Sequence, residues 1–375
     1  MGSDNPPNTI LNQSLLDAPD SPATRSAIST GLWGNDTPTT PTAGQRLHSA
    51  DRNPTNPDDT YWTYYHQECT NALHDGGRHV AARTHADIVS CAAKLRRGMA
   101  REDVKDALRA ELLRARCHAN DEELLDNSVD LTASLLLMAN FGRYAYGFSG
   151  RNRVCWTKGS LGEFLRDYFE PERRLVNEGV KLERVFKASS LDRIAGLEVV
   201  WTDNLADHLR LTDDDRKVHL FHHASFLETQ RQSADSLLPS GLAEETLRTL
   251  ALLCPTADAE TKQWLAGLPN HGDLDRGVNQ CGRLKTDDRR IDNFFFWRDR
   301  LVMVKQVFDE AQPKTIRQWW YDSRNGVQWY TFWVAVLVLV LTVVFGLVQS
   351  VEGALQVYVS FKALDTGEHL GPGGT

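Results

Sequence analysis

Residues 329–349 read WYTFWVAVLVLVLTVVFGLVQ, and this stretch decides how the rest of the chain is organised. No charged residue lies between Arg324 and Glu352, and 13 of the 19 residues from 330 to 348 are Leu, Val or Phe. As an α-helix, the stretch rises about 31 Å, which is close to the hydrocarbon thickness of a bilayer. A buried helix of a soluble protein is the alternative, but the length and the lack of charge favour a transmembrane helix.

The flanks of this stretch predict its orientation. Lys314, Arg317 and Arg324 precede it, whereas Lys362 is the only Lys or Arg that follows it. The positive-inside rule therefore places the preceding part in the cytosol and residues 350–375 across the membrane as a short exoplasmic or lumenal tail. An aromatic and basic segment, 313–328, is expected at the membrane surface. The predicted interface residues are Trp319, Trp320, Arg324, Trp329, Tyr330 and Trp333.

Composition narrows the possible partners. Of the 375 residues, 41% are hydrophobic and 25% are charged, which is ordinary for a globular protein. The net charge of −8 gives no general attraction to nucleic acid, so we expect none as a partner. The six cysteines are widely spaced without a CxxC pair, a pattern typical of reduced thiols. The expected partners are the lipid bilayer and unidentified proteins.

Three regions are expected before the apolar stretch. Residues 1–58 are predicted to be a disordered arm, because they are rich in Pro, Ser, Thr, Asn and Asp and hold few apolar residues. Residues 59–312 show helical spacing of apolar side chains over most of their length. Within them, residues 154–223 include short alternating segments that predict strands. The predicted fold is mainly α, with a small β-containing subregion and one C-terminal transmembrane helix.

The subregion 154–223 has two interpretations. Its expected order is a strand at 154–156, helices at 160–169 and 181–194, and strands near 197–201, 209–211 and 218–221. Together with the helix that precedes residue 154, this order of elements matches a winged-helix module. The alternative interpretation is an α+β insertion. Beyond it, a long helix is predicted over residues 288–312.

One group of side chains could hold a metal ion. Its members combine imidazoles and carboxylates, which are common ligands of zinc and iron: Asp203, Asp207, His208, His219, His222 and His223. Their spacing matches no zinc signature, so surface and hydrogen-bonded histidines are the favoured interpretation, and His219 is expected to point to solvent. No phosphate-binding loop, dinucleotide fingerprint, nucleophile elbow or Cys/His protease pattern occurs. We therefore predict no cofactor and no catalytic residue.

Small residues recur at four-residue spacing within and just after the apolar stretch, at Gly346, Ser350 and Ala354. Such a stripe lets two transmembrane helices approach closely, which gives a weak expectation of self-association.

Four further segments carry a resemblance: LEVVWTDNLADHLRL (197–211), FHHASFL (221–227), ETLRTLALLCP (245–255) and the stretch from QWWYDSRNGVQWY to GALQVY (318–358). In these segments the chain resembles a family of fungal single-pass membrane proteins of unknown activity. The resemblance covers about residues 120–358. It implies a helical cytosolic domain followed by one C-terminal span, and it implies no catalytic or ligand-binding residue.

The sequence thus predicts a non-catalytic, membrane-anchored interaction or adaptor protein. Two alternatives stay open: a histidine-dependent metal enzyme acting at a membrane, and a membrane-tethered regulator that uses a winged helix.

Overall fold

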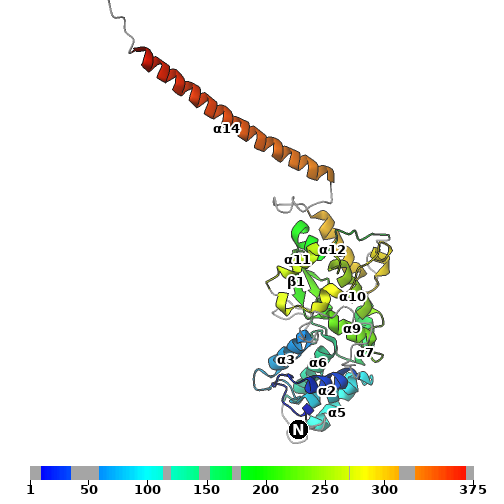
Figure 1. Cartoon of the computed structure of the whole chain (residues 1–375). Helices are drawn as coiled ribbons and strands as arrows, with labels where there is room; N and C mark the ends of the chain where they lie inside the picture. The colour runs from blue at the N-terminus through cyan, green and yellow to red at the C-terminus, as the bar shows by residue number, and fades with distance from the viewer. Residues whose placement is uncertain are drawn as a thin grey trace, which may run out of the picture. The chain divides into compact units, whose positions relative to one another are not determined.

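The structure is a computed structural model, and it describes residues 10–34, 59–112, 120–142, 153–170, 179–269, 271–311 and 326–368. The chain divides into two compact units, Met1–Gln312 and Pro313–Thr375. The prediction of a mainly α fold with a small sheet and one long apolar C-terminal helix is confirmed (Figure 1).

The N-terminal part of the first unit is a group of packed helices around α6. They are α2 (Pro22–Trp33), α3 (Asp59–Leu73), α4 (His85–Arg96), α5 (Arg101–Leu112) and α6 (Asp121–Leu137) (Figure 1). Helix α6 is buried around most of its circumference and contacts α3, α4 and α5. A helix that is buried nearly all round is typical of a protein core, and α6 lies there although Ser128, Asp130 and Thr132 are among its buried residues.

Residues 10–34 are folded, so the prediction of a disordered arm over residues 1–58 is wrong for this part. Helix α2 begins after Ser21, whose hydroxyl accepts the main-chain N–H groups of the first helical turn, and it ends at a glycine with φ of 73°. Ile28 and Leu32, four residues apart, are fully buried in the core. The high proline content concealed this helical spacing, and the rest of the predicted arm lies outside the described residues.

A three-stranded sheet follows, made of β1 (Glu198–Thr202), β2 (Leu211–Thr212) and β3 (Lys217–Phe221). The strand order is β1-β3-β2, so β3 is central. β1 pairs parallel to β3, and β2 pairs antiparallel to it. The parallel pairing sets the ends of β1 and β3 side by side, and this positions the site described below.

The winged-helix interpretation of residues 154–223 is wrong. Lys181 is extended and bridges to Arg290, and the predicted third helix is reduced to α8 (Ala188–Ser190) and one π-helical turn, η2 (Leu191–Ala195). Val154 forms an isolated bridge instead of a strand of the sheet. The helix at 161–169, α7, is present as expected.

The C-terminal part of the first unit is again helical. It contains α9 (Ala224–Gln232), α10 (Leu242–Leu253), α11 (Ala259–Ala266) and α12 (Arg298–Glu310) (Figure 1). The predicted helix over 288–312 is correct only from Arg298. Before it, the main-chain N–H groups of Phe295 and Trp297 bond to the carboxylate of Glu245, at 2.8 Å each, instead of joining a helix. Because Glu245 binds these N–H groups, the segment before Arg298 forms turns although its apolar residues are spaced as in a helix.

The second unit contains helix α14 (Gly326–Glu368), which has 43 residues. Its segment Trp329–Lys362 is long and apolar enough to cross a membrane, by length and composition. Those 34 residues rise about 51 Å as a helix, more than a bilayer core of about 30 Å. The helix therefore continues past the predicted span 329–349, and most of the predicted tail 350–375 is helical.

The predicted interface residues divide between described and undescribed parts. Trp329, Tyr330 and Trp333 lie in the first turns of α14, where the Trp329 ring is 5.2 Å from the Tyr330 ring and 6.2 Å from the Trp333 ring. Trp319, Trp320 and Arg324 lie outside the described residues.

The small residues Gly346, Ser350 and Ala354 are exposed on α14 and follow one another at four-residue spacing. The Ser350 hydroxyl donates to the carbonyl oxygen of Gly346, at 2.8 Å, and so is satisfied within its own helix.

Candidate functional site

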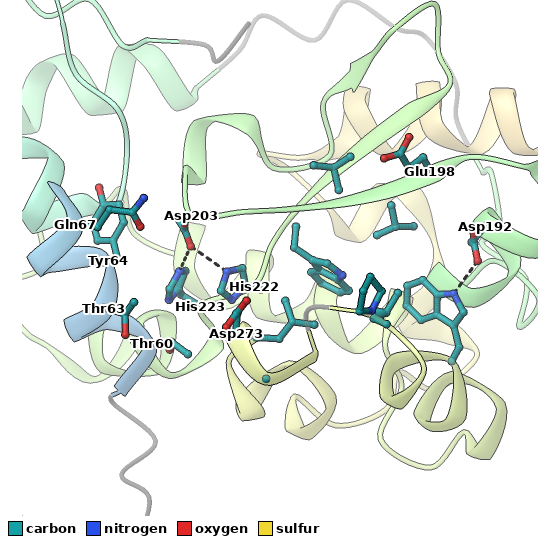
Figure 2. Close-up of a pocket in the computed structure, with 18 residues that line it drawn as sticks. Thr60, Thr63, Tyr64, Gln67, Asp192, Glu198, Asp203, His222, His223 and Asp273 are labelled. Atoms are coloured by element: carbon teal, nitrogen blue, oxygen red, sulfur yellow. Dashed lines mark hydrogen bonds and ion pairs between the residues drawn. The ribbon is translucent and has the colours of Figure 1, made fainter. Parts of the chain in front are cut away.

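A cleft of about 860 Å³ lies in the first unit between α3, the edge of β1 and the segment around residues 264–274 (Figure 2). Its volume falls within the range of about 300–1,000 Å³ usual for ligand pockets. The polar and aromatic side chains that line it are Thr60, Thr63, Tyr64, Gln67, Asp192, Glu198, Trp201, Asp203, His222, His223, Trp264 and Asp273.

Asp203, His222 and His223 meet in this cleft because of the parallel strand pairing. Thr202, the last residue of β1, pairs with Phe221, the last residue of β3. The residues that directly follow the two strands therefore emerge at the same end of the sheet. The structure thus brings together three of the residues that the sequence singled out (Figure 2).

Both histidines hydrogen-bond to one carboxylate oxygen. The Nε2 atom of His222 lies 3.0 Å from Oδ1 of Asp203, and that of His223 lies 2.7 Å from the same atom. The main-chain N–H of Asp275 donates to Nδ1 of His222, at 3.3 Å, so the proton of that neutral imidazole is on Nε2. The Nδ1 atom of His223 is buried and has no partner among the described residues.

This arrangement shifts the pKa values of the group. Burial alone would raise the pKa of Asp203, but the hydrogen bonds from His222 and His223 outweigh it and hold that pKa well below its usual range. Burial lowers the pKa of His223 to about 4, although its hydrogen bond to Asp203 opposes that shift. At neutral pH the cleft therefore holds an ionised Asp203 beside a neutral His223.

The same three side chains offer ligand atoms within 4.8 Å of one another, so they must be tested as a metal centre. A histidine that binds a metal through Nε2 carries its proton on Nδ1 and usually donates it to an acceptor. His222 instead faces the N–H of Asp275 with Nδ1, and Nδ1 of His223 has no acceptor among the described residues. The hydrogen bond at Nδ1 of His222 is therefore the opposite of the one that a metal ligand makes.

The stacking of the two imidazoles supports the same conclusion. The ring centroids of His222 and His223 are 4.0 Å apart, and the ring planes differ by 29°. Both Nε2 atoms point to Oδ1 of Asp203, at 3.0 Å and 2.7 Å, so this carboxylate oxygen occupies the point at which the two rings converge. The cluster therefore fits a hydrogen-bonded triad.

His208 and Asp207 lie away from the cleft. His208 is fully buried, accepts the N–H of Phe221 at Nδ1 (3.1 Å) and lies 2.7 Å from the Thr249 hydroxyl through Nε2. Burial, with a smaller contribution from Arg300, lowers its pKa to about 3. Asp207 is buried and pairs with Arg210, at 2.8 Å. These residues fix the segment between β1 and β2.

His219 also lies outside the cleft. Its Nε2 atom is 3.0 Å from the Thr212 hydroxyl across the β2–β3 hairpin, and its side chain is half-buried rather than fully exposed to solvent.

Other lining residues were not singled out from the sequence. Trp201 and Trp264 place their rings 6.3 Å apart, and Asp192 accepts the indole N–H of Trp264, at 2.8 Å. Tyr64 comes from α3, and Asp273 comes from a short turn after α11. No local pattern distinguishes these residues, because only the tertiary fold brings them to the cleft.

Comparison of the chain with family models, with curated proteins and with solved structures finds no match. The site and the long apolar helix must therefore carry the functional interpretation.

Proposed function

We propose that the chain is a non-catalytic, membrane-anchored interaction protein, in which α14 is the anchor and the first unit binds a partner. The observation that carries the anchoring is the exposure of large apolar side chains along α14, from Tyr330 to Phe361. Exposed apolar surface on this scale is unfavourable in water and suits the hydrocarbon core of a bilayer.

The chemistry of the cleft supports binding over catalysis. Among the described residues that line it there is no serine or cysteine nucleophile, and both histidines direct Nε2 to Asp203. A carboxylate whose pKa is held so low is a poor general base near neutral pH. The cleft therefore offers recognition groups rather than a nucleophile with its base.

The proposed orientation puts the first unit in the cytosol. Its supports are Lys314, Arg317 and Arg324 before the anchor and Lys362 alone after it. Among the described residues the cysteines are unpaired, which suits a reducing compartment. Burial raises the pKa of Cys91 to about 11, so this thiol is unreactive.

Relationship to the fungal single-pass proteins is part of the same proposal. The segments that carry the resemblance form β1, the residues after β3 and most of α10. They include Asp203, His222 and His223, so the similarity falls on the cleft as well as on the anchor. The proposal also includes self-association through Gly346, Ser350 and Ala354, because small residues at four-residue spacing let two helices approach closely.

Two measurements test the anchoring. Alkaline carbonate extraction of membranes should leave the full chain in the pellet, and protease added to the cytosolic side of sealed vesicles should digest the first unit. If carbonate releases the full chain into the supernatant, α14 is not a membrane anchor. Protection of the first unit, with cleavage of the C-terminal end alone, would reverse the orientation.

A metal-dependent enzyme remains the second candidate, because three possible ligands do converge in the cleft. The hydrogen bond that Nδ1 of His222 accepts disfavours this candidate, and the metal content of the purified chain decides between the two.

A further inference from the structure

The cleft exposes the edge of a strand rather than a face of the sheet. β1 pairs with β3 on one side only, and it ends the strand order of the described sheet. Four consecutive residues, Glu198 to Trp201, line the cleft. A strand face presents every second side chain, so a run of consecutive lining residues identifies an edge.

Alternation of the main-chain groups shows which of them face outward. The N–H of Glu198 donates to the carbonyl oxygen of Arg216, at 2.8 Å, on the β3 side. Successive residues of a strand direct their N–H and C=O groups to opposite sides, so those of Val199 and Trp201 point away from β3. No described hydrogen bond joins the main chain of these two residues to another element. An unpaired edge of this kind is a template for another extended segment.

The charge of the cleft indicates what that segment carries. Asp192, Glu198, Asp203 and Asp273 contribute carboxylates, and no Lys or Arg is among the described lining residues. Lys217 offsets part of this charge, since its Nζ lies 3.5 Å from Glu198. The remaining negative potential, in a concave site, favours a cation.

Aromatic side chains strengthen that preference. The rings of Trp201 and Trp264 lie 6.3 Å apart and 44° out of parallel, beside the carboxylate of Asp192. Indole faces attract guanidinium and ammonium groups, and more strongly than other aromatic rings do. The indole N–H of Trp201 is buried and has no partner among the described residues, so the Trp201 ring contributes its face rather than its N–H to this preference.

We propose that an extended segment of a partner protein, with Lys or Arg at alternate positions, adds to the free edge of β1 and directs its cationic side chains to Asp203, Asp273 and the Trp201–Trp264 pair. The segment makes main-chain hydrogen bonds with Val199 and Trp201, in the manner of β-strand addition. This inference rests on the proposed interaction function and names the chemistry of its partner. The main-chain groups favour a peptide over a lipid headgroup or a metal ion, neither of which extends an edge strand.

The test uses the full chain in a neutral detergent and a fluorescein-labelled peptide of eight residues that alternates Lys or Arg with Val or Thr. Fluorescence anisotropy should show saturable binding that weakens as salt is added, because exposed charges are screened. A peptide of the same sequence, N-methylated at alternate amides, keeps every charge but cannot donate along one edge. We expect it to bind at least about tenfold more weakly, since the proposal depends on main-chain pairing.

Two substitutions test the two halves of the inference. Val199→Pro removes an outward N–H that β3 does not use, and proline is tolerated on an edge strand, so we expect about a tenfold loss of affinity without unfolding. Asp273→Asn removes an exposed carboxylate of the cleft, and we expect about a threefold loss and a weaker dependence on salt. Asp214→Asn, in the β2–β3 turn outside the cleft, is the matched charge control and should change nothing.

Several results would overturn the inference. Equal affinities of the chain for the N-methylated and the unmodified peptide would exclude strand addition. Equal affinities of Val199→Pro and the wild type for the unmodified peptide would also exclude it. If Asp273→Asn and Asp214→Asn bind the peptide with equal affinity, the carboxylate of Asp273 does not recognise its cationic side chains. Self-association of the chain without peptide binding would assign the edge to a second copy. If the chain stays in carbonate-washed membranes while peptide binding fails, only this inference fails and the anchor stands.

Discussion

The Nε2 atom of His223 lies 2.7 Å from Oδ1 of Asp203, although 20 residues separate them along the chain. The contact exists because β1 and β3 run parallel and end together. This hydrogen bond helps to keep Asp203 ionised and holds its carboxylate in the lining of the cleft. The edge strand β1 lines the same cleft. The parallel pairing thus places Asp203 beside His222 and His223, while the terminal position of β1 in the strand order leaves its outer edge unpaired.

Acid should destabilise the first unit in two steps. His223 and His208 have pKa values of about 4 and about 3, below the usual 6.5, so only the unfolded chain binds their protons as the pH falls from 6.5 to 4. Each then lowers the free energy of unfolding by about 1.4 kcal/mol per pH unit. The pKa of Asp203 is lowered, so its contribution is present above pH 4 and is lost below it. Urea unfolding of the full chain in neutral detergent, followed by tryptophan fluorescence, measures both steps.

A substitution isolates one of these histidines. His208→Asn keeps an acceptor for the N–H of Phe221 but cannot be protonated in this range. We expect lower stability at pH 7 and a flatter decline between pH 6.5 and 4. His74→Asn, at an exposed position, serves as the control and should keep the wild-type slope. An unchanged slope in His208→Asn would show that other groups cause the acid sensitivity.

Glu245 should be essential for the segment before α12, whereas its neighbour Glu244 should not. Glu245→Ala removes the carboxylate that accepts the buried N–H of Trp297 and the part-buried N–H of Phe295. Each unsatisfied group costs about 1–3 kcal/mol, so we expect a loss of about 3 kcal/mol or more. Glu244→Ala changes an exposed side chain of the same type and should shift the unfolding midpoint little. Similar midpoints for the two variants would contradict the assigned hydrogen bonds.

The sequence was informative wherever the structure depends on local spacing or on overall composition. Apolar residues at helical intervals predicted α7, and the long uncharged run predicted α14. The predicted start of α7 at residue 160 is correct, because the hydroxyl of Ser160 accepts the main-chain N–H of Glu163 and caps the helix there.

The errors between residues 154 and 312 share a different cause, which is competition from partners that are distant in the sequence. Glu245 captures N–H groups about 50 residues away, so the pattern before Arg298 cannot form a helix. The parallel pairing of β1 with β3 joins two strands that are not consecutive in the sequence. No short sequence pattern shows that these two strands pair, or which residues lie opposite one another. Tyr64, Asp192 and Asp273 reach the cleft from separate elements, and their identity as lining residues follows only from the tertiary fold.

Metal analysis should find no stoichiometric ion. We expect the purified full chain to contain well below one zinc, iron or manganese per molecule, because Nδ1 of His222 accepts the N–H of Asp275 and its proton is therefore on Nε2. Titration with Zn²⁺ should give the same weak response for the wild type and for His222→Asn. One bound metal per chain, lost in His222→Asn, would instead establish the metal-enzyme candidate.

Arg101 should stabilise the N-terminal helices far more than an arginine two turns later. Its guanidinium is buried and bonds to Asp130 at 2.6 Å and to Asp126 at 3.1 Å. Arg101→Met leaves two carboxylates without this partner, and breaking a buried pair costs about 3–5 kcal/mol. Arg109→Met removes a more exposed arginine that also contacts carboxylates, and its midpoint should stay near the wild type. A loss in Arg101→Met no larger than that in Arg109→Met would refute this role.

Charges placed in the middle of α14 should release the chain from membranes. Val340→Arg combined with Val344→Arg puts two guanidinium groups on one exposed face of the apolar segment. Each costs about 2.5–3.5 kcal/mol at the centre of a spanning helix, which is comparable to the whole insertion preference of the stretch. We expect the double variant to appear in the carbonate supernatant. Phe361→Arg, near the C-terminal limit of the apolar segment, can reach the membrane surface and should stay in the pellet. If the double variant also resists extraction, α14 is not the element that holds the chain to the bilayer.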